Sequence, residues 1–440
     1  MNKTIEKIVS LCKRRGFIFQ SSDIYGGFSA IYDYGPLGIE LKNNISQLWW
    51  KDMTQVHENI VGLDSGILMH PKIWEASGHL GAFNDPLVDC KQCKSRYRAD
   101  EFSEDYASID WQSIQCPNCG TTGSFTEPRQ FNLMFKTHVG PMEESGTEAF
   151  LRPETAQGIY VNYQLVQGAM RMKVPFGIAQ IGKAFRNEIV ARNFIFRTRE
   201  FEQMEMQYFV KPGTDDDILN QWKDKRLNFY LEKLDIEKSK LRYHEHDDSE
   251  LAHYAKEAWD IEYDFPFGWS EIEGIHNRTD FDLSRHQEFS GKNLSYFDQP
   301  INERYLPYII ETSAGLNRML LTVLADAYWE DEDNNRTVMK FHPRLAPVKA
   351  VICPLTKKDG LPEKAREVLE ILKPHFKVIY DQQGSIGKRY YRQDEAGTPF
   401  GITVDHESLE DNTVTVRDSD SMKQDRISID QLLTAIQDSI

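Results

Sequence analysis

The stretches QIGKAFRNE (180–188) and FRTREFEQME (196–205) interleave arginine and glutamate with phenylalanine and isoleucine. A solvated helix places its charges on one face at a spacing of about 3.6 residues, whereas a half-buried strand alternates apolar and polar side chains. The two stretches show the second pattern. We therefore predict two long strands between residues 178 and 210, joined by a loop near 191–193 into an antiparallel hairpin.

This hairpin carries side chains suited to a phosphorylated ligand. An arginine on a rigid strand can hold a phosphate through two parallel hydrogen bonds, and Arg186 and Arg197 are the candidates. Glu188 lies two residues after Arg186, so it points to the same face and could accept hydrogen bonds from an amino group such as that of adenine. Phe201 could stack on a planar base. A hairpin with only cross-strand salt bridges and aromatic packing remains open as an alternative.

A second segment, IIETSAGLNRML (309–320), combines an extended apolar run, a turn of small residues and a helix. A helix N-terminus after Ser-Ala-Gly offers free backbone N–H groups and the positive end of the helix dipole, which suit an anion. Arg318 adds a full positive charge there. The simpler interpretation of this segment by itself is a strand-to-helix turn with a capping serine.

Length and composition restrict the class of protein. With 440 residues, 40% hydrophobic and 27% charged, the chain can form two or three domains. A net charge of −16 argues against nonspecific coating of nucleic acid, although a basic patch such as KRYYR (388–392) could bind a shaped RNA. The N-terminal stretch 1–17 predicts a short amphipathic helix rather than a signal peptide, and no apolar run approaches the roughly 18 residues that span a bilayer. We expect a cytoplasmic protein with no membrane partner.

Local patterns predict the order of helices and strands. A helix over 38–57 begins at YGPLG and precedes a strand over 62–71 that ends at Pro71. Residues 216–238 and 248–259 are predicted to be helical, and 268–283 and 308–313 extended. A composition shift at RLAPVKAVICPL (344–355) starts an alternation of strand, helix (362–374) and strand (376–380), which predicts a separate α/β domain with a mostly parallel sheet.

Two CxxC pairs, CKQC (90–93) and CPNC (116–119), lie in the polar, loop-rich stretch 86–128, which we interpret as an insertion with its own small fold. The spacing of Cys90, Cys93, Cys116 and Cys119 is typical of a tetrahedral zinc site, which a reducing compartment favours over disulfides. Four thiolates leave no open coordination position, so such a zinc would be structural. The alternative is a pair of thiol knuckles without zinc.

The stretch HEHDDSELAH (244–253) is a second possible metal site, because His244, His246 and His253 lie among acidic residues. Its pattern agrees better with the end of a strand followed by a helix that is capped at Asp248 or Ser249.

Several motifs together resemble a known family. FRNE (185–188) and GLNR (315–318) are similar to motifs 2 and 3 of the class II aminoacyl-tRNA synthetases. The resemblance to the homodimeric type of glycyl-tRNA synthetase is closer, and it extends in that family's order over HPKIWEASGHLGAFNDPLVDC (70–90), RPETAQGIY (152–160), FRTREFEQME (196–205), GWSEIEGIHNRTDFDL (268–283) and ETSAGLNR (311–318).

This resemblance implies an architecture. The class II fold is an α+β catalytic domain with an antiparallel sheet of six or seven strands, here 1–343, followed by a C-terminal α/β anticodon-binding domain, here 344–440. Within the first domain we expect the zinc-ribbon-like insertion at about 86–128 and a helical insertion at about 212–262. The helix over 38–57 and the strand ending at Pro71 would be motif 1, which implies a homodimer.

The resemblance also implies an ATP site with Mg²⁺. Arg186 would contact the α-phosphate and Arg318 the γ-phosphate of a bent ATP, and these two residues with Glu311 are the catalytic candidates. Glu188 and Phe201 would place the adenine, with Arg197 nearby, and Glu271 and Glu311 would lie near the metal. The complete expected ATP-binding set is Arg186, Asn187, Glu188, Phe196, Arg197, Thr198, Arg199, Glu200, Phe201, Glu271, Ile272, Gly315, Leu316, Asn317 and Arg318.

A site for glycine has to bind the ammonium with acidic groups and block the space beyond Cα. Because every competing amino acid is larger, steric rejection can be enough. The residues that match the family's substrate positions are Arg98, Glu154, Phe201, Glu202, Gln203, Met204, Glu205, Arg278, Glu311, Thr312, Ser313, Ala314 and Gly315.

In the C-terminal domain, GSIGKRYYRQDEAGTPFGITV (384–404) resembles the anticodon-domain signature of the family. Lys388, Arg389 and Arg392 would meet tRNA phosphates, and Tyr390 or Tyr391 could stack on a base. A solvated basic loop is the alternative.

The function that the resemblance implies is ATP-dependent activation of glycine and its transfer to the 3′ end of tRNA-Gly. Other hypotheses are a synthetase for serine, proline or threonine, a non-catalytic paralogue that keeps the fold to bind nucleic acid, and an RNA-binding zinc-ribbon protein. The retention of Arg186, Glu188 and Arg318 speaks against a non-catalytic paralogue.

Overall fold

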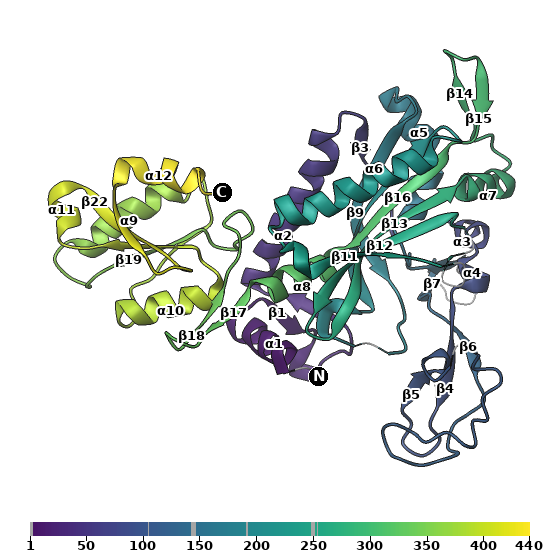
Figure 1. Cartoon of the computed structure of the whole chain (residues 1–440), viewed down its shortest axis with the longest axis horizontal. Coiled ribbons are helices and arrows are strands. Elements are labelled where there is room, and N and C mark those ends of the chain that lie inside the picture. Colours follow the sequence, from purple (N-terminus) through teal and green to yellow (C-terminus); the bar gives the residue numbers. More distant parts are fainter. Residues whose placement is uncertain (1–2, 104, 142–146, 191, 248–250, 253) are drawn as a thin grey trace.

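The computed structural model describes residues 3–103, 105–141, 147–190, 192–247, 251–252 and 254–440. A large part contains the first 340 or so residues, and a smaller C-terminal part lies beside it (Figure 1). In the described residues, no helix has the length and apolar composition needed to cross a membrane.

The larger part is built on a seven-stranded sheet. Its strands, in spatial order, are β11 (Leu241–Glu245), β12 (Glu257–Phe265), β13 (Gly268–Thr279), β16 (Tyr308–Gly315), β10 (Glu200–Val210), β9 (Phe176–Phe185) and β3 (Ile60–Gly62). All neighbouring strands are antiparallel except β3, which runs parallel to β9. The predicted hairpin is present as β9 and β10, paired from Phe176 with Phe209 to Phe185 with Glu200.

Side chains that alternate along the strands give this sheet two different faces. On β10, Met204, Met206 and Tyr208 belong to the main apolar core, whereas Gln203 and Glu205 line a cavity on the opposite face. All residues from 203 to 210 are buried. The expected half-buried strand is therefore buried on both faces, because its polar residues line the cavity and do not face solvent.

Helices cover both faces. The main core is completed by α1 (Lys3–Arg15), α2 (Pro36–Lys51), α6 (Asp215–Asn228) and α8 (Leu316–Ala327). On the cavity face, α5 (Ala156–Met170) and α7 (Phe281–Ser290) pack with Phe176, Phe209 and Ile309 into a second core. That core fills one end of this face and leaves the other end for the cavity.

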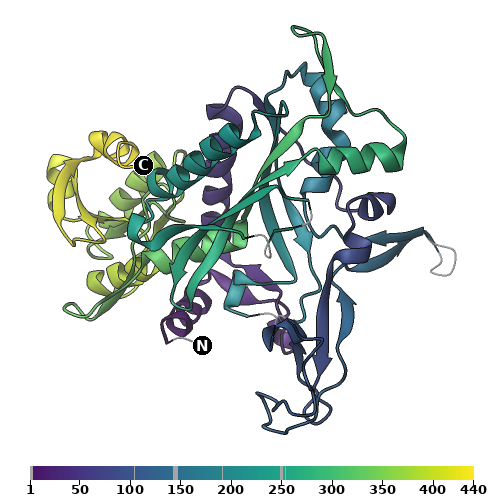
Figure 2. The ribbon, with the colours of Figure 1, turned by 45° about the vertical axis from the view of Figure 1, so that its right-hand side comes forward.

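A small insertion projects from the larger part and is seen at the bottom of Figures 1 and 2. Its sheet contains β4 (Asn84–Asp89), β5 (Arg96–Arg98) and β6 (Arg129–Asn132). Trp111 and Phe125 form a core of its own with neighbours that include Val88 and Cys116. The expectation that 86–128 has its own small fold agrees with this separate core.

The C-terminal part has a five-stranded sheet in the order β20 (Val378–Tyr380), β19 (Ala350–Pro354), β21 (Phe400–Val404), β22 (Thr413–Asp418) and β23 (Gln424–Ser428). Its helices are α9 (Leu361–Leu372), α10 (Ile386–Ala396), α11 (Glu407–Asp411) and α12 (Ile429–Gln437). The pairs β19–β20 and β19–β21 are parallel, whereas β21–β22 and β22–β23 are antiparallel, so the sheet is mixed and not mostly parallel as predicted. The strands β21, β22 and β23 follow one another as an antiparallel meander.

A buried charge cluster, which we call the seam cluster, joins the two parts. Arg336, in the hairpin β17 (Tyr328–Asp331) and β18 (Arg336–Met339), donates to Asp331 Oδ2 and to Asp394 Oδ2 of α10, each at 2.7 Å. Arg417 of β22 donates to both oxygens of Asp394 at 2.8 and 3.0 Å. All four side chains are at least 95% buried, so the charges are neutralised within the protein.

The remaining elements are short. They are β1 (Ile18–Gln20), β2 (Tyr32–Tyr34), α3 (Lys72–Ala76), α4 (His79–Ala82), β7 (Lys136–Val139), β8 (Thr147–Phe150), β14 (Tyr296–Asp298) and β15 (Glu303–Tyr305). The hairpin β14–β15 projects at the top of Figure 1.

Three local predictions differ from the structure. The strand expected over 62–71 ends at Gly62, and the rest of that segment is irregular apart from a bridge between Leu68 and Leu151. In 248–259, predicted to be helical, residues 257–259 begin β12, while Asp248, Ser249 and His253 lie outside the described residues. The segment 212–262 contains α6 but also β11 and most of β12, because its second half adds strands to the large sheet.

Candidate active site

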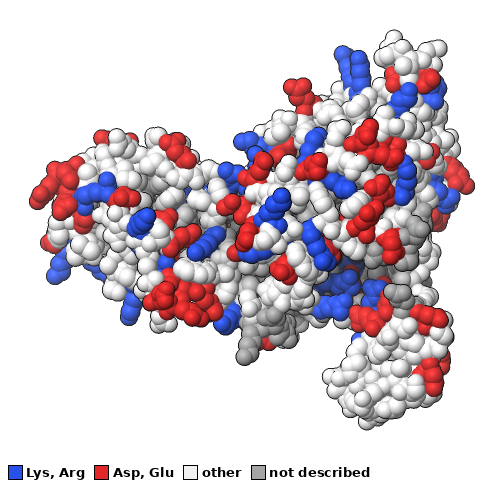
Figure 3. Space-filling view, viewed as in Figure 1, with Lys and Arg blue, Asp and Glu red and all other residues white. Residues whose placement is uncertain are grey.

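A cavity of about 240 Å³ opens on the face of the large sheet that carries Gln203 and Glu205. Its lining residues come mainly from β10, β13, β16 and the connections at their ends: Glu154, Arg186, Glu188, Ile195, Phe196, Arg197, Thr198, Phe201, Gln203, Glu205, Tyr254, Glu271, Gly274, His276, Arg278, Glu311, Ser313, Gly315, Asn317 and Arg318. In Figure 3, Lys and Arg side chains gather in a hollow between the main body and the insertion.

Two arginines from distant parts of the chain meet in this cavity. Arg186 follows β9, donates from Nε to the carbonyl oxygen of Pro153 at 3.1 Å and lies over the rings of Phe83 and Phe201. Arg318 lies in the first turn of α8, and its Nη1 is 2.9 Å from Oε2 of Glu271. The predicted convergence of Arg186 and Arg318 on one cavity is therefore present.

The connection between β9 and β10 supplies two further charged groups. Nη1 of Arg197 lies 3.8 Å from Oε2 of Glu188. Burial lowers the pKa of the Arg197 guanidinium, partly offset by the charge of Glu188. Arg199 donates to the carbonyl oxygen of Glu188 and to that of Ser29, so it holds the backbone of this connection and does not line the cavity.

Three glutamates lie toward the other end of the cavity. Glu205 accepts hydrogen bonds from the hydroxyl groups of Thr155 and Ser313 and from Nε2 of Gln203. Glu154 accepts from Nε2 of Gln157 at 2.9 Å and lies 3.4 Å from Nε2 of His79.

Glu311 is the most completely bonded of the three. Its Oε1 lies 3.0 Å from Nδ1 of His276, and its Oε2 accepts from Gln207 at 2.7 Å and from Arg278 at 3.2 Å. Arg278 is anchored in turn by two hydrogen bonds to Asp282, of 2.8 and 3.0 Å. Burial alone would raise the pKa of Glu311, but Arg278 and His276 hold it below its usual range.

The ionisation of Glu205 differs from that of its neighbours. Burial, and then repulsion by Glu311 and Glu154, raise the pKa of Glu205 to about 8. The pKa of Glu154 is held below its usual range because His79 and Arg278 outweigh its burial. Near neutral pH, two of the three glutamates at this end are therefore ionised and Glu205 is mostly protonated. A cation at this end would favour the loss of that proton.

Several predicted site residues do not line the cavity. Ile272, Leu316 and Ala314 belong to the main core with Met204, and Thr312 is also buried, because these positions alternate with those that face the cavity. Glu200 and Glu202 pair with lysines, Lys183 and Lys42 respectively. The backbone N–H of Asn187 donates to the carbonyl oxygen of Leu133.

Arg98 lies in the insertion and is not among the lining residues. It donates to Asp100 and lies 3.2 Å from Oδ1 of Asp85.

Sequence reasoning missed four lining residues. Gly274 and His276 precede Arg278 at two-residue intervals on β13, so the alternation in GWSEIEGIHNRT could have indicated them. Tyr254 lies in an irregular connection and Ile195 in a single 3₁₀ turn, Phe194–Phe196, so no periodic pattern identifies them.

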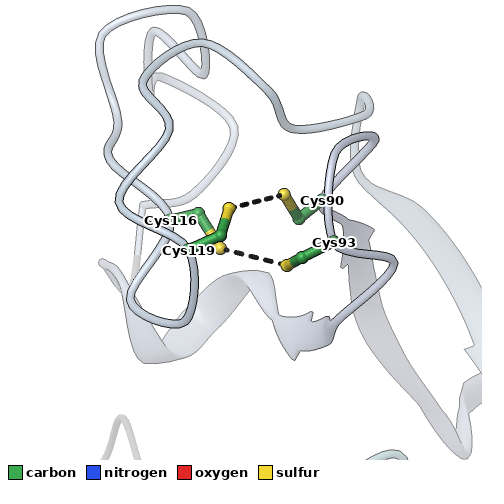
Figure 4. A group of neighbouring side chains, drawn as sticks. All are labelled: Cys90, Cys93, Cys116 and Cys119. Atoms are coloured by element: carbon green, nitrogen blue, oxygen red, sulfur yellow. Dashed lines mark hydrogen bonds between the residues drawn. The ribbon is translucent and has the colours of Figure 1, made fainter.

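The four paired cysteines meet in the insertion (Figure 4). The Sγ atoms of Cys90 and Cys119, and those of Cys93 and Cys116, are 3.7 Å apart, and all four lie within 4.8 Å of one another. Hydrogen bonds from Ser95 and Asn118 lower the pKa of the Cys93 thiol to about 5. This donor set and spacing fit a tetrahedral metal ion.

The histidines of the second proposed metal stretch do not form such a group. Nε2 of His246 lies 2.9 Å from Oδ2 of Asp260. Within the part of the chain that the structure describes, neither His244 nor His246 belongs to a cluster of three or more potential metal ligands. The expected strand end is present as β11.

The basic residues proposed for tRNA binding differ in exposure. Lys388 is exposed, whereas Arg389 is buried and donates to the carbonyl oxygens of Pro354 and Gly384. Arg389 is therefore not placed to meet a phosphate, because α10 turns its side chain inward. Tyr390 is buried against Thr403, and Tyr391 is exposed.

Comparisons with known proteins agree with this geometry. The family model for the tRNA synthetase class II core domain (G, H, P, S and T) matches residues 135–327, and the model for the anticodon binding domain matches 349–439. The glycine–tRNA ligase of Treponema denticola is 60% identical over 99% of this chain and 97% of its own length. The chain belongs to the glycine–tRNA ligase family.

Other members of the glycine–tRNA ligase family are also similar to it. Those of Borrelia hermsii and Thermobifida fusca are 56% and 52% identical over 99% and 98% of this chain and 97% of their own lengths. Among solved structures, a prolyl-tRNA synthetase from Cryptosporidium parvum shares the fold with a TM-score of 0.68 at 14% identity, over 99% of this chain and 77% of that one. These findings confirm the predicted class II core with a C-terminal anticodon-binding domain.

Proposed function

We propose that this chain activates glycine with ATP and transfers the glycyl group to the 3′ end of tRNA-Gly. The observation that supports this function best is the polarity of the cavity. Arginines gather at one end, where Arg186 and Arg318 suit a polyphosphate, and three glutamates lie toward the other end, where they suit an ammonium group.

The arginine end would hold a bent ATP. Arg318 would contact the γ-phosphate and Arg186 the α-phosphate, and Phe201 and Glu188 would place the adenine. Glu271 fits a nearby Mg²⁺ because its carboxylate is about half exposed. Glu311 does not fit that role, because Arg278, His276 and Gln207 already occupy its oxygens. Bound Mg²⁺ would neutralise charge on the leaving pyrophosphate.

At the glutamate end, the ammonium of glycine would lie among Glu154, Glu205 and Glu311. One carboxylate oxygen of glycine then attacks the α-phosphorus, and the bond to pyrophosphate breaks. In the second step a ribose hydroxyl of the tRNA attacks the carbonyl carbon and AMP leaves. Positioning and charge stabilisation are sufficient for both steps, so no side chain has to act as a nucleophile.

The four-cysteine cluster would hold a structural Zn²⁺. Four thiolates complete a tetrahedral coordination and leave no position for a substrate. The metal would stabilise an insertion whose own apolar core is small.

A homodimer is the assembly that we propose. Ile24, Tyr25 and Phe28 form an apolar loop of which the first two side chains are 88% and 87% exposed. Exposed groups of large apolar side chains are typical of protein–protein interfaces. The loop lies before β2 and α2, the helix that the family resemblance assigns to motif 1. A monomer by light scattering at micromolar concentration would contradict this assembly.

We propose the boundaries 1–343 and 344–440 for the two domains, with tRNA contacted by Lys388 and Arg392 in the second, and a cytoplasmic location. Arg392 is partly exposed and donates to Asp381. A tRNA phosphate would have to compete with that carboxylate.

The direct test is ATP–pyrophosphate exchange with each of the twenty amino acids. Glycine alone should drive the exchange. Exchange driven by serine, proline or threonine would identify another synthetase, and no exchange with any amino acid would favour a non-catalytic paralogue.

A further inference from the structure

Tyr254 lines the cavity from outside the sheet. It lies in the connection between β11, which ends at Glu245, and β12, which begins at Glu257. Its ring stacks on the guanidinium group of Arg278, with Cζ of Arg278 3.8 Å from the centroid of the Tyr254 ring. The centroids of the Tyr254 and Phe281 rings are 6.4 Å apart. Arg278 is fixed by Asp282 and Glu311, so the surface on which the ring rests is rigid.

Strand register shows at which end of the cavity this contact lies. On β16, Gly315 is opposite Gln203, Ser313 is opposite Glu205, and Glu311 is opposite Gln207 on one side and His276 on the other. The floor from Gly315 to Glu311 is therefore ~13 Å long, at about 3.3 Å per residue. Arg318 marks the nucleotide end, and Arg278 is bonded to Glu311 at the opposite end. Tyr254 covers that opposite end.

The floor of this end cannot select glycine by itself. Glu205 and Ser313 suit an ammonium group, and the negative charge of Glu311 favours one, but all amino acids carry that group. Rejection of larger amino acids requires a rigid, bulky group in the space that a side chain on Cα of the bound amino acid would occupy.

We propose that the ring of Tyr254 closes the amino-acid end of the cavity and excludes every side chain larger than hydrogen. This inference rests on the proposed function, because it assigns the substrate selectivity of that same site. Stacking on Arg278 holds the ring in place, and it is the bulk of the ring, not its hydroxyl group, that excludes the competitor.

The test compares Tyr254→Ala with Tyr254→Phe in the full-length chain. Exchange driven by glycine, alanine and serine is measured for each variant, and kcat/KM for glycine is divided by that for alanine. We expect this ratio to fall at least about tenfold in Tyr254→Ala, the discrimination that a single methyl group usually carries. The ratio should be retained in Tyr254→Phe, which keeps the ring.

Tyr243→Ala is the matched control. Tyr243 is a partly buried tyrosine of β11 that donates to the carbonyl oxygen of Lys223 and does not line the cavity. Its removal should leave the ratio unchanged. If Tyr254→Ala is poorly folded by thermal melting, Tyr254→Leu, which keeps an apolar contact with Arg278, should lower the same ratio.

An unchanged ratio in folded Tyr254→Ala, with glycine and alanine use reduced equally, would overturn the inference. Tyr254 would then only support Arg278. Failure of the wild-type chain to use glycine would contradict the proposed function instead, so the two failures are distinguishable.

Discussion

Individual side chains determine the chemistry of the cavity, and Arg318 is the clearest case. Replacing it with alanine removes a positive charge from the nucleotide end, and we expect kcat for ATP–pyrophosphate exchange to fall by about 10²–10³-fold. Because this side chain is mostly buried and donates to the carbonyl oxygens of Phe196 and Glu271, the exchange is measured at a temperature where thermal melting shows the variant to be folded.

Arg242→Ala is the control for this variant. Arg242, on the outer strand β11, pairs with Glu262 of β12, and the Arg242 side chain is about half exposed. Its loss should leave the exchange rate within about twofold, as expected for an exposed ion pair. An equal loss of exchange in both variants would contradict the role of Arg318.

The raised pKa of Glu205 predicts proton release when glycine binds. Its pKa of about 8 means that the carboxyl group is mostly protonated at pH 7 in the empty cavity. An ammonium group beside it favours the ionised form, so binding should release up to one proton. Titration calorimetry in two buffers of different ionisation enthalpy measures this number, and Glu205→Gln should abolish the release.

The same group predicts a pH dependence of stability. The pKa of Glu205 is raised on folding, from the model-peptide range near 4.5 to about 8, so the folded state binds more protons than the unfolded state between these values. The free energy of unfolding contributed by this group is therefore present below about pH 4.5 and lost as pH rises to 8. Denaturant unfolding of the ligand-free protein from pH 5 to 8 should show a shallower pH dependence in Glu205→Gln than in the wild-type chain. Similar slopes would contradict the raised pKa.

At the scale of elements, the four-cysteine cluster predicts one bound metal ion per chain. We expect about one equivalent of zinc by elemental analysis, and Cys116→Ser should lose it because a three-thiolate site binds zinc more weakly. Cys353→Ala removes a buried thiol that lies outside the cluster and serves as the control. Full zinc content in Cys116→Ser would contradict the site.

Strands were easier to predict from the sequence than the residues between them. The hairpin of β9 and β10 and the strand β16 follow from the alternation of apolar and polar residues, and α2 follows from Pro36 in its first turn. The predicted strand after α2 was wrong over most of its length, because the apolar residues of 62–71 pack as an irregular segment. The alternation also could not show that the polar face is buried, since the covering helices come from distant parts of the chain.

Site residues in motifs could be predicted from the sequence, whereas those in the connections between strands could not. Arg186, Glu205, Glu311 and Arg318 could be predicted because they lie in motifs with a recognisable pattern. Tyr254 could not, because a connection between strands has no period and its contact with Arg278 is a tertiary one. Arg389 was assigned to a basic surface because the sequence does not show which side of α10 faces inward.

In the whole molecule, the seam cluster predicts how the two parts depend on each other. Asp394→Asn leaves Arg336 and Arg417 buried without their shared carboxylate, which should destabilise the protein by about 3–5 kcal/mol. Exchange with glycine should be retained at a temperature where the variant is folded, whereas charging of tRNA should fall, because only charging needs both parts.

Asp381→Asn is the control within the same C-terminal part. It removes the partner of Arg392, whose side chain is 37% exposed and can be hydrated, so the loss should be about 1 kcal/mol and smaller than for Asp394→Asn. Equal destabilisation by the two substitutions, measured by denaturant unfolding, would contradict the importance of burial in the seam cluster.

The seam cluster has one further consequence, which concerns the RNA. Arg336 links the two parts through hydrogen bonds to Asp394 and to the carbonyl oxygens of Ser419 and Asp420. Buried bonds of this kind resist hinge motion, so the separation between the anticodon-binding surface and the cavity is set by the protein. A tRNA must match this separation from its anticodon to its 3′ end. The enzyme would thus discriminate by length as well as by bases, and a tRNA extended by one base pair in its anticodon stem should be charged slowly even though every nucleotide that the protein reads is unchanged.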